Sequence, residues 1–160
     1  MQIEYASLRE LRPYTGNART HSRDQIKQIA KSIKAFGFCN PVLVDDDKQI
    51  IAGHGRVQAA TLLGINAVPI VRLSHLNAAE KRAYILADNK LAQKAGWDRE
   101  ILAIELQGLV ELNFDIDLTG FEMAEVDLIL EEAAEAKSEG SGTEDAVPDP
   151  LPASTVTQLG

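Results

Sequence analysis

The chain of 160 residues is 45% hydrophobic, enough for one domain with its own core, and it contains no apolar run of membrane-spanning length. Its one cysteine excludes an intramolecular disulfide, so a reducing cytoplasm is the expected compartment and a membrane is not an expected partner. The net charge of −8 is unevenly placed: residues 122–160 hold ten acids and one base, a net of −9, which leaves +1 for residues 1–121. The acidic total therefore does not exclude nucleic acid as a partner of the N-terminal part.

Apolar spacing and turn residues predict alternating strands and helices up to about residue 96. The strands are expected at 3–6, 41–44, 49–52 and 67–73, and the helices between 22 and 37, at 56–63, and from 77 to 86 or 91. Ser22 and Asn77 are the expected N-caps, because Gln25 and Glu80 follow as capping-box partners. The predicted fold class is α/β (α+β), a small mixed sheet flanked by helices.

The turn between the second and third strands is acidic. It reads Asp45-Asp46-Asp47-Lys48 and is expected to be a solvated hairpin turn rather than a cation site.

Beyond residue 96 the pattern is wholly helical. Asp98 is expected to cap a helix, and a last helix is expected from about 123 to 136. The side chains expected on the buried face of the helix after Asp98 are Ile101, Leu102, Leu106 and Leu109. From 137 onward Ser, Gly, Glu and Pro dominate, which is typical of a disordered linker or tail. The predicted divisions are thus 1–96, a nucleotide- or phosphate-binding domain; 97–136, a helical extension; and 137–160, a linker.

The most informative segment is Gly53-His54-Gly55-Arg56, which lies between a predicted strand and a predicted helix. Glycines let backbone N–H groups approach a phosphate closely, and a helix N-terminus presents unpaired donors. Arg56 adds a guanidinium fork, and His54 adds a hydrogen-bond donor or proton-transfer group. The alternative interpretation is a tight strand–helix turn with a surface arginine.

Several segments follow one another in a characteristic order. They are Phe36-Gly37-Phe38-Cys39-Asn40-Pro41-Val42-Leu43-Val44, Gly53-His54-Gly55-Arg56 with its helix, Gly64-Ile65-Asn66-Ala67-Val68-Pro69-Ile70-Val71, and Ala87-Asp88-Asn89-Lys90. Their order and spacing over roughly residues 3–95 resemble the ParB/sulfiredoxin superfamily. The nearest resemblance is to the ParB-like N-terminal (ParB-like nuclease) domain of the type fused to DNA methyltransferases.

The resemblance implies a nucleoside triphosphate, CTP or ATP, bound together with Mg²⁺. The residues that it assigns to phosphate or nucleotide binding are Arg19, His21, Asn40, Gly53, His54, Gly55, Arg56, Asn89 and Lys90. It assigns catalysis to His54 and Arg56, and metal binding to Asp88. Asn40 would contact the base, and the basic segment of Arg19 and His21 would close over the nucleotide.

Two parts of this assignment have open alternatives. Where the family carries a later arginine, this chain has Ala92, so Lys90 or Lys94 would have to supply the charge, and lysine lacks the guanidinium fork. Asp88 and Asn89 would otherwise form an ordinary solvated helix end. Arg19 would otherwise be an exposed loop charge.

The expected function is a nucleotide-binding, DNA-associated module that forms the N-terminal part of a DNA-modifying (methyltransferase) protein, with nucleotide-dependent pairing of two copies. The predicted acidic last helix repels phosphates, so DNA contact is expected to be weak, through the basic 9–34 region, or through a fused domain. The alternatives are a nuclease, an NTPase or a nucleotide-dependent phosphotransferase that uses His54, and a non-catalytic interaction module. Sulfiredoxin chemistry is excluded, because His54 stands where those enzymes carry their catalytic cysteine.

Overall fold

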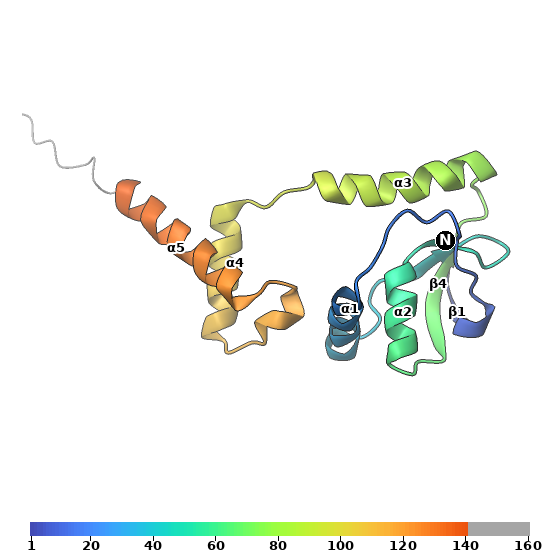
Figure 1. Ribbon diagram of the computed structural model, residues 1–160, viewed down its shortest axis with the longest axis horizontal. Helices are drawn as coiled ribbons and strands as arrows, with labels where there is room; N and C mark the ends of the chain where they lie inside the picture. Colours follow the sequence, from blue (N-terminus) through green and yellow to red (C-terminus); the bar gives the residue numbers. More distant parts are fainter. Residues whose placement is uncertain (141–160) are drawn as a thin grey trace, which may run out of the picture.

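The computed structural model describes residues 1–140 (Figure 1). Its strands are β1 (Ile3–Ser7), β2 (Val42–Val44), β3 (Ile50–Ala52) and β4 (Ala67–Arg72). Its helices are η1 (Leu8–Glu10), α1 (Arg23–Phe36), α2 (His54–Leu62), α3 (Ala78–Lys94), α4 (Arg99–Glu111), η2 (Ile116–Thr119) and α5 (Met123–Gly140). The predicted class, a small mixed sheet flanked by helices, is confirmed.

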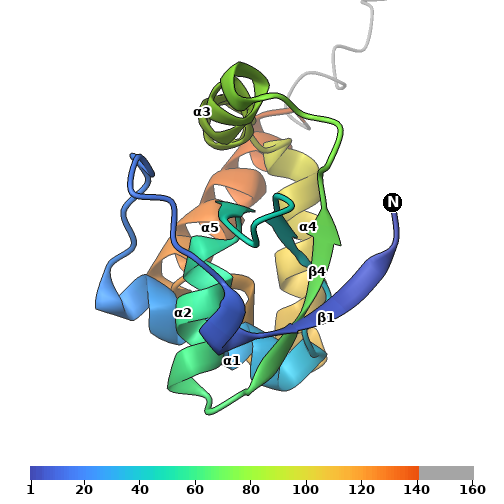
Figure 2. The ribbon, with the colours of Figure 1, turned by 90° about the vertical axis from the view of Figure 1, so that its right-hand side faces the viewer.

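The four strands form one sheet in the order β1-β4-β2-β3. β4 runs antiparallel to β1 and parallel to β2, while β2 and β3 form an antiparallel hairpin. Figure 2 looks onto this sheet from the side of β1 and β4. The parallel pair needs a crossover, and α2 supplies it between β3 and β4.

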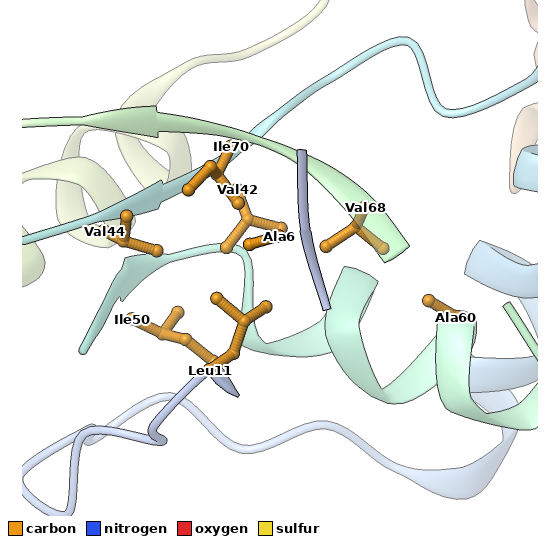
Figure 3. Close-up of a cluster of buried hydrophobic side chains, with 8 residues drawn as sticks. All are labelled: Ala6, Leu11, Val42, Val44, Ile50, Ala60, Val68 and Ile70. Carbon is orange, nitrogen blue, oxygen red and sulfur yellow. The ribbon is translucent and has the colours of Figure 1, made fainter. Parts of the chain in front are cut away.

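Alternation along the strands gives the sheet two apolar faces. On the first face, side chains of the strands pack with Leu11, which follows η1, and with Ala60 of α2. The buried residues of this cluster are Ala6, Leu11, Val42, Val44, Ile50, Ala60, Val68 and Ile70 (Figure 3). On the second face, Ile51, Val71 and Leu73 pack with Ile85 of α3. α2 and α3 therefore cover opposite faces of the sheet near β3, and α1 packs against α2.

The predicted caps are present. Ser22 accepts from the backbone N–H of Gln25 and Asn77 from that of Glu80, and each capping box is complete. The helix after Asn77 is longer than predicted and continues to Lys94.

Helices α4 and α5 form a second apolar cluster away from the sheet (Figure 1). Leu102 and Leu106 are buried there, but Ile101, predicted to be buried, is 59% exposed. Successive helix residues point about 100° apart, and the face that α5 covers is centred on Leu102 and Leu106. The segment between α4 and η2 contacts the N-terminal part through Phe114, whose ring stacks on that of Phe36 at 6.3 Å between centroids.

The end of α5 differs from the prediction. The helix continues through Gly140, so residues 137–140, predicted to begin a disordered linker, are helical. Within this last turn, Ser138 donates its hydroxyl to the carbonyl of Glu135. The rest of the predicted linker, 141–160, lies outside the described residues. No helix within residues 1–140 is long and apolar enough to cross a membrane.

Candidate functional site

The turn from β3 into α2 is built on Gly53, whose φ of +104° and ψ of +21° lie in the left-handed region. This conformation favours glycine, and a Cβ at this position would lie 2.9 Å from Nη2 of Arg56, so the guanidinium would have to shift. The helix begins at His54, two residues earlier than predicted. Gly53 makes no side-chain cap, so the N–H groups of His54, Gly55 and Arg56 lack partners within the helix.

Arg56 lies half-buried above this turn. Its Nη2 donates to the carbonyl of Pro41 at 3.1 Å, while its buried Nε has no acceptor among the described residues. Burial lowers the pKa of Arg56, and the negative charge of Asp88 acts in the opposite direction. No carboxylate of residues 1–140 forms an ion pair with Arg56. The site therefore holds a partly desolvated cation without a contacting counterion.

Two histidines stand beside this cation. Nε2 of His54 accepts a hydrogen bond from the backbone N–H of Tyr14 at 3.2 Å, so the neutral ring carries its proton on Nδ1. Burial lowers the pKa of His54, and the charge of His21 lowers it further. Burial also lowers the pKa of His21, with the charge of Arg19 as the second cause. A Cβ on Gly55 would lie 3.1 Å from Nε2 of His21, so Gly55 allows that ring to approach α2 closely.

The pKa values of these histidines predict a pH-dependent stability. Their folded-state values are lowered, so their contribution to the free energy of unfolding is present above the unfolded value of about 6.5 and is lost as the pH falls through the folded values. We expect urea unfolding at pH 7.5 and 5.5 to show a loss of stability that becomes smaller in a His21→Gln/His54→Gln variant. His75→Gln, at an exposed position away from this site, is the control. An equal loss in the double variant and the wild type would contradict this assignment.

Helix α3 provides the opposite wall. Asp88 and Asn89 line a cavity of about 190 Å³ together with the α2 N-terminus and the loop before α1. Nδ2 of Asn89 donates to the carbonyl of Ile85 at 2.8 Å, which leaves its Oδ1 free to face a ligand. Burial raises the pKa of Tyr84, and the charge and hydrogen bond of Asp88 raise it further, so Asp88 is tied to its own helix as well.

Most of the residues predicted from the sequence meet at this cavity. The residues that line it are Asn17, Arg19, His21, Ile29, Ile51, Ala52, Gly53, His54, Gly55, Arg56, Asp88, Asn89 and Ala92. Asn40 and Lys90 do not line it, and both are exposed. Lys90 follows Asn89 by one helix position and so lies about 100° away from it around α3. Asn40 precedes Pro41, and it is the carbonyl of Pro41 that reaches the site by accepting from Arg56.

Asn17 was missed by the sequence analysis. Its Oδ1 accepts from the backbone N–H of Arg19, and its Nδ2 donates to the Arg19 carbonyl, both at 3.2 Å. Asn17 thus shapes the loop that carries Arg19 and His21 to the cavity. Asn17 follows Gly16 and lies two residues before Arg19, and this Gly-Asn pair is a turn signal that would have drawn attention to it.

No group of three or more His, Cys, Asp or Glu side chains within residues 1–140 is arranged to hold a metal ion. Asp88 is the one carboxylate among the described residues that line the cavity. A metal held by the protein alone is therefore not built into the described site, and Asp88 with Asn89 could only complete a shell that a ligand's own oxygens supply.

In this α+β domain a strand turns through a left-handed glycine into an uncapped helix N-terminus, beside an arginine without an ion-pair partner in residues 1–140, an arrangement typical of anion sites. Residues 1–90 match the model of the ParB N-terminal domain, so the chain belongs to this family. Residues 100–159 match the ParB-methyltransferase HTH domain. The resemblance found in the sequence is thereby confirmed.

Known relatives agree with this assignment. The chain is 51% identical over 82 residues to the ParB-like nuclease domain-containing protein YnaK of Escherichia coli K12, covering 51% of this chain and 94% of YnaK. It is 30% identical over 88 residues to a probable chromosome-partitioning protein ParB of Rickettsia bellii, covering 54% of this chain but only 30% of that protein. The chain thus matches less than a third of the length of that ParB relative.

The fold also has a solved counterpart. The C-terminally truncated chromosome-partitioning protein ParB from Caulobacter crescentus, in complex with CTP-γ-S, superposes with a TM-score of 0.68 at 22% identity, covering 91% of this chain and 88% of that one. At this level of identity the similarity establishes the shared fold.

The HTH match corrects one expectation. The sequence analysis did not expect the helical extension to be a DNA-reading unit, because α5 carries many acids, among them Glu125, Asp127, Glu131 and Glu132. The match instead indicates that a region similar to the HTH domain of ParB-methyltransferase proteins follows the ParB-like domain. The acidic surface charge gave no indication of this match, because a helix-turn-helix fold is defined by apolar packing, which α4 and α5 have.

Proposed function

We propose that this chain is a nucleotide-binding, DNA-associated module whose cavity at the α2 N-terminus takes the phosphates of a nucleoside triphosphate. The observation that carries the proposal is Arg56, a half-buried cation without an ion-pair partner in residues 1–140, next to three helix N–H groups without helical acceptors. A phosphate would offset the cost of burying this charge and would accept from those amides.

The loop before α1 supports the same ligand. Arg19 and His21 line the cavity from the side opposite α3, so a phosphate between them and Arg56 would be surrounded by donors. Burial and nearby positive charge lower the pKa of both histidines, and a bound phosphate would raise the pKa of each.

Asp88 would favour the binding of a cation together with the phosphates. A carboxylate in the same small cavity as a triphosphate repels it, whereas a divalent ion between them turns this repulsion into attraction. Asp88 and Oδ1 of Asn89 are the groups that would complete a Mg²⁺ shell made mainly of phosphate oxygens and water. When bound, the ion supplies charge neutralisation of the phosphates.

We expect Asp88→Asn to make nucleotide binding less dependent on Mg²⁺. In EDTA the variant should bind a triphosphate about tenfold more tightly than the wild type, because one negative charge facing the ligand is gone. Calorimetric titration with and without Mg²⁺ measures this. Glu80→Gln alters a carboxylate of α3 away from the cavity and should leave both affinities unchanged. Weaker binding by Asp88→Asn in EDTA would contradict the repulsion.

CTP is the first nucleotide to consider, because the Caulobacter ParB of the same fold was crystallised with CTP-γ-S. The HTH match supports a further part of the proposal, that the chain belongs at the N-terminal end of a DNA-modifying methyltransferase protein. A location in the cytoplasm is also part of the proposal, and the single cysteine of the sequence supports it. Nucleotide binding would then regulate contact with DNA and the pairing of two copies.

A nuclease is the second candidate, and the description of YnaK as a ParB-like nuclease domain-containing protein favours it. Against it, two-metal phosphodiester hydrolysis needs several carboxylates, and the described residues of the cavity include only Asp88.

The deciding experiment is calorimetric titration of the protein with CTP, ATP and GTP in Mg²⁺, paired with a metal-dependent DNA cleavage assay. Saturable binding of one nucleotide without DNA cleavage is the expected result. Cleavage of DNA together with no nucleotide binding would replace the proposal by the nuclease, and neither activity would leave a non-catalytic interaction module.

A further inference from the structure

Helix α3 carries part of the site, although few of its side chains are buried against the rest of the domain. Ile85 is its one buried residue, while Leu86 and Leu91 are 59% and 64% exposed. In Figures 1 and 2 the helix lies over one end of the sheet and leads away toward α4. Its second half nevertheless brings Asp88 and Asn89 to the cavity. A contact near the N-terminus of α3 can therefore influence the direction of the whole helix.

Besides the packing of Ile85, an ion pair with a buried carboxylate attaches α3 to the rest of the domain. Nζ of Lys81 lies 3.1 Å from Oδ2 of Asp45, a residue that is only 5% exposed. Oδ1 of Asp45 accepts from the backbone N–H groups of Asp47 at 3.0 Å and Gln49 at 2.9 Å. Burial raises the pKa of Asp45, but the bonds from Gln49 and Lys81 outweigh it and leave the pKa below its ordinary value. The prediction that this turn is solvated is therefore wrong for Asp45, which is buried.

The turn that holds Asp45 is itself fixed to the sheet. The Arg72 guanidinium donates to the carbonyl of Asp46 at 3.0 Å and forms an ion pair with Glu4 at 3.1 Å. The hydroxyl of Ser74 donates to Asp46 at 2.5 Å. Asp45 is therefore held in place by the sheet and the turn, and its carboxylate fixes the position of the Lys81 ammonium.

Helix geometry connects this point with the cavity. Lys81, Ile85, Asp88 and Ala92 follow the spacing i, i+4, i+7 and i+11, which places them on one face of α3. Seven residues at about 1.5 Å each put Asp88 about 10 Å along the helix from Lys81. A small tilt at Lys81 therefore becomes a displacement of Asp88 and Asn89.

We propose that Asp45 and Lys81 are positioning residues of the nucleotide site, acting through α3. Neither lines the cavity, and their ion pair sets the direction in which α3 presents Asp88 and Asn89 to the phosphates. The part that concerns ligand affinity rests on the proposed function. The part that concerns the position of α3 stands on the ion pair alone.

Two readouts test the proposal on the full chain. Spin labels on Gln58→Cys of α2 and Leu91→Cys of α3, both exposed positions, with the exposed Cys39 changed to Ser, report the α2–α3 distance. Calorimetric titration with CTP and Mg²⁺ reports affinity. We expect Lys81→Met to broaden or shift the distance distribution and to weaken CTP about tenfold, and we expect Lys81→Arg to restore both.

The matched control is Arg82→Met, which removes the adjacent and exposed cation of the same helix and should change neither readout. Asp45→Asn keeps the two backbone acceptor bonds and gives a second variant if Lys81→Met does not fold. A wild-type distance distribution in both Lys81→Met and Asp45→Asn would overturn the proposal, even if the melting temperature fell. If the wild type binds no nucleotide, the proposed function fails, and the label distances still decide whether the ion pair positions α3.

Discussion

Arg56→Ala is expected to weaken nucleotide binding about a hundredfold, because charge-assisted hydrogen bonds to a phosphate are worth roughly 3 kcal/mol. The fold should persist. The substitution removes one bond to the carbonyl of Pro41, but it also removes a buried Nε without an acceptor, so these two changes act in opposite directions on stability. Calorimetric titration with CTP and Mg²⁺ and urea unfolding measure the two effects.

Two further variants give this test its specificity. Arg56→Lys keeps the charge but loses the planar fork, and it should recover part of the lost affinity. Arg23→Ala removes an exposed arginine at the start of α1 and should bind as the wild type does. Unchanged affinity in Arg56→Ala would refute the role of this arginine in phosphate binding.

Gly53→Ala is expected to reduce both stability and binding. A side chain at the left-handed conformation of residue 53 costs about 1–2 kcal/mol, and its Cβ would meet the Arg56 guanidinium at 2.9 Å. Since the helix N-terminus and the arginine would both shift, nucleotide affinity should fall to about the level of Arg56→Ala. Urea unfolding and the same titration provide the measurements.

Gly64 provides a control for the backbone strain that a side chain causes at a left-handed position. Its φ is +69°, also left-handed, but a Cβ there would meet no atom within 4 Å. Gly64→Ala should therefore show the conformational cost alone and leave binding intact. In the Gly53→Ala/Arg56→Ala double variant the clash is absent, so its loss of stability should be smaller than the sum of the two single losses. Equal stability and binding in the Gly53→Ala and Gly64→Ala variants would contradict the close contact with Arg56.

The parts of the fold that were predictable from the sequence are those with local causes. The capping boxes at Ser22 and Asn77 were found because both partners lie within four residues of each other. The sheet class followed from the order of strands and helices. Asp45 was misjudged because its partner Lys81 lies 36 residues away, and only the packing of α3 on the sheet brings the two together.

The candidate site also has parts that local sequence predicts and parts that depend on residues far apart in the chain. The Gly53-to-Arg56 turn carries its signal in adjacent residues, whereas the contribution of α3 to the cavity was predicted only through the family resemblance. Neither source indicated that Lys90 points away or that Asn17 shapes the basic loop. The direction of Lys90 follows from helix spacing once α3 is known to continue past it, whereas the hydrogen bonds of Asn17 depend on the conformation of its loop.

The hydrogen bond from Tyr14 to His54 limits the chemistry available to this histidine. A neutral imidazole has one lone pair in the ring plane, and that of His54 already accepts from a backbone amide. It cannot serve as a general base or bind a metal through that nitrogen unless the loop of Tyr14 moves. The proton on Nδ1 remains available for donation. His54 is therefore equipped to recognise an oxyanion, and a mechanism that asks it to activate water must first break the contact between Tyr14 and α2.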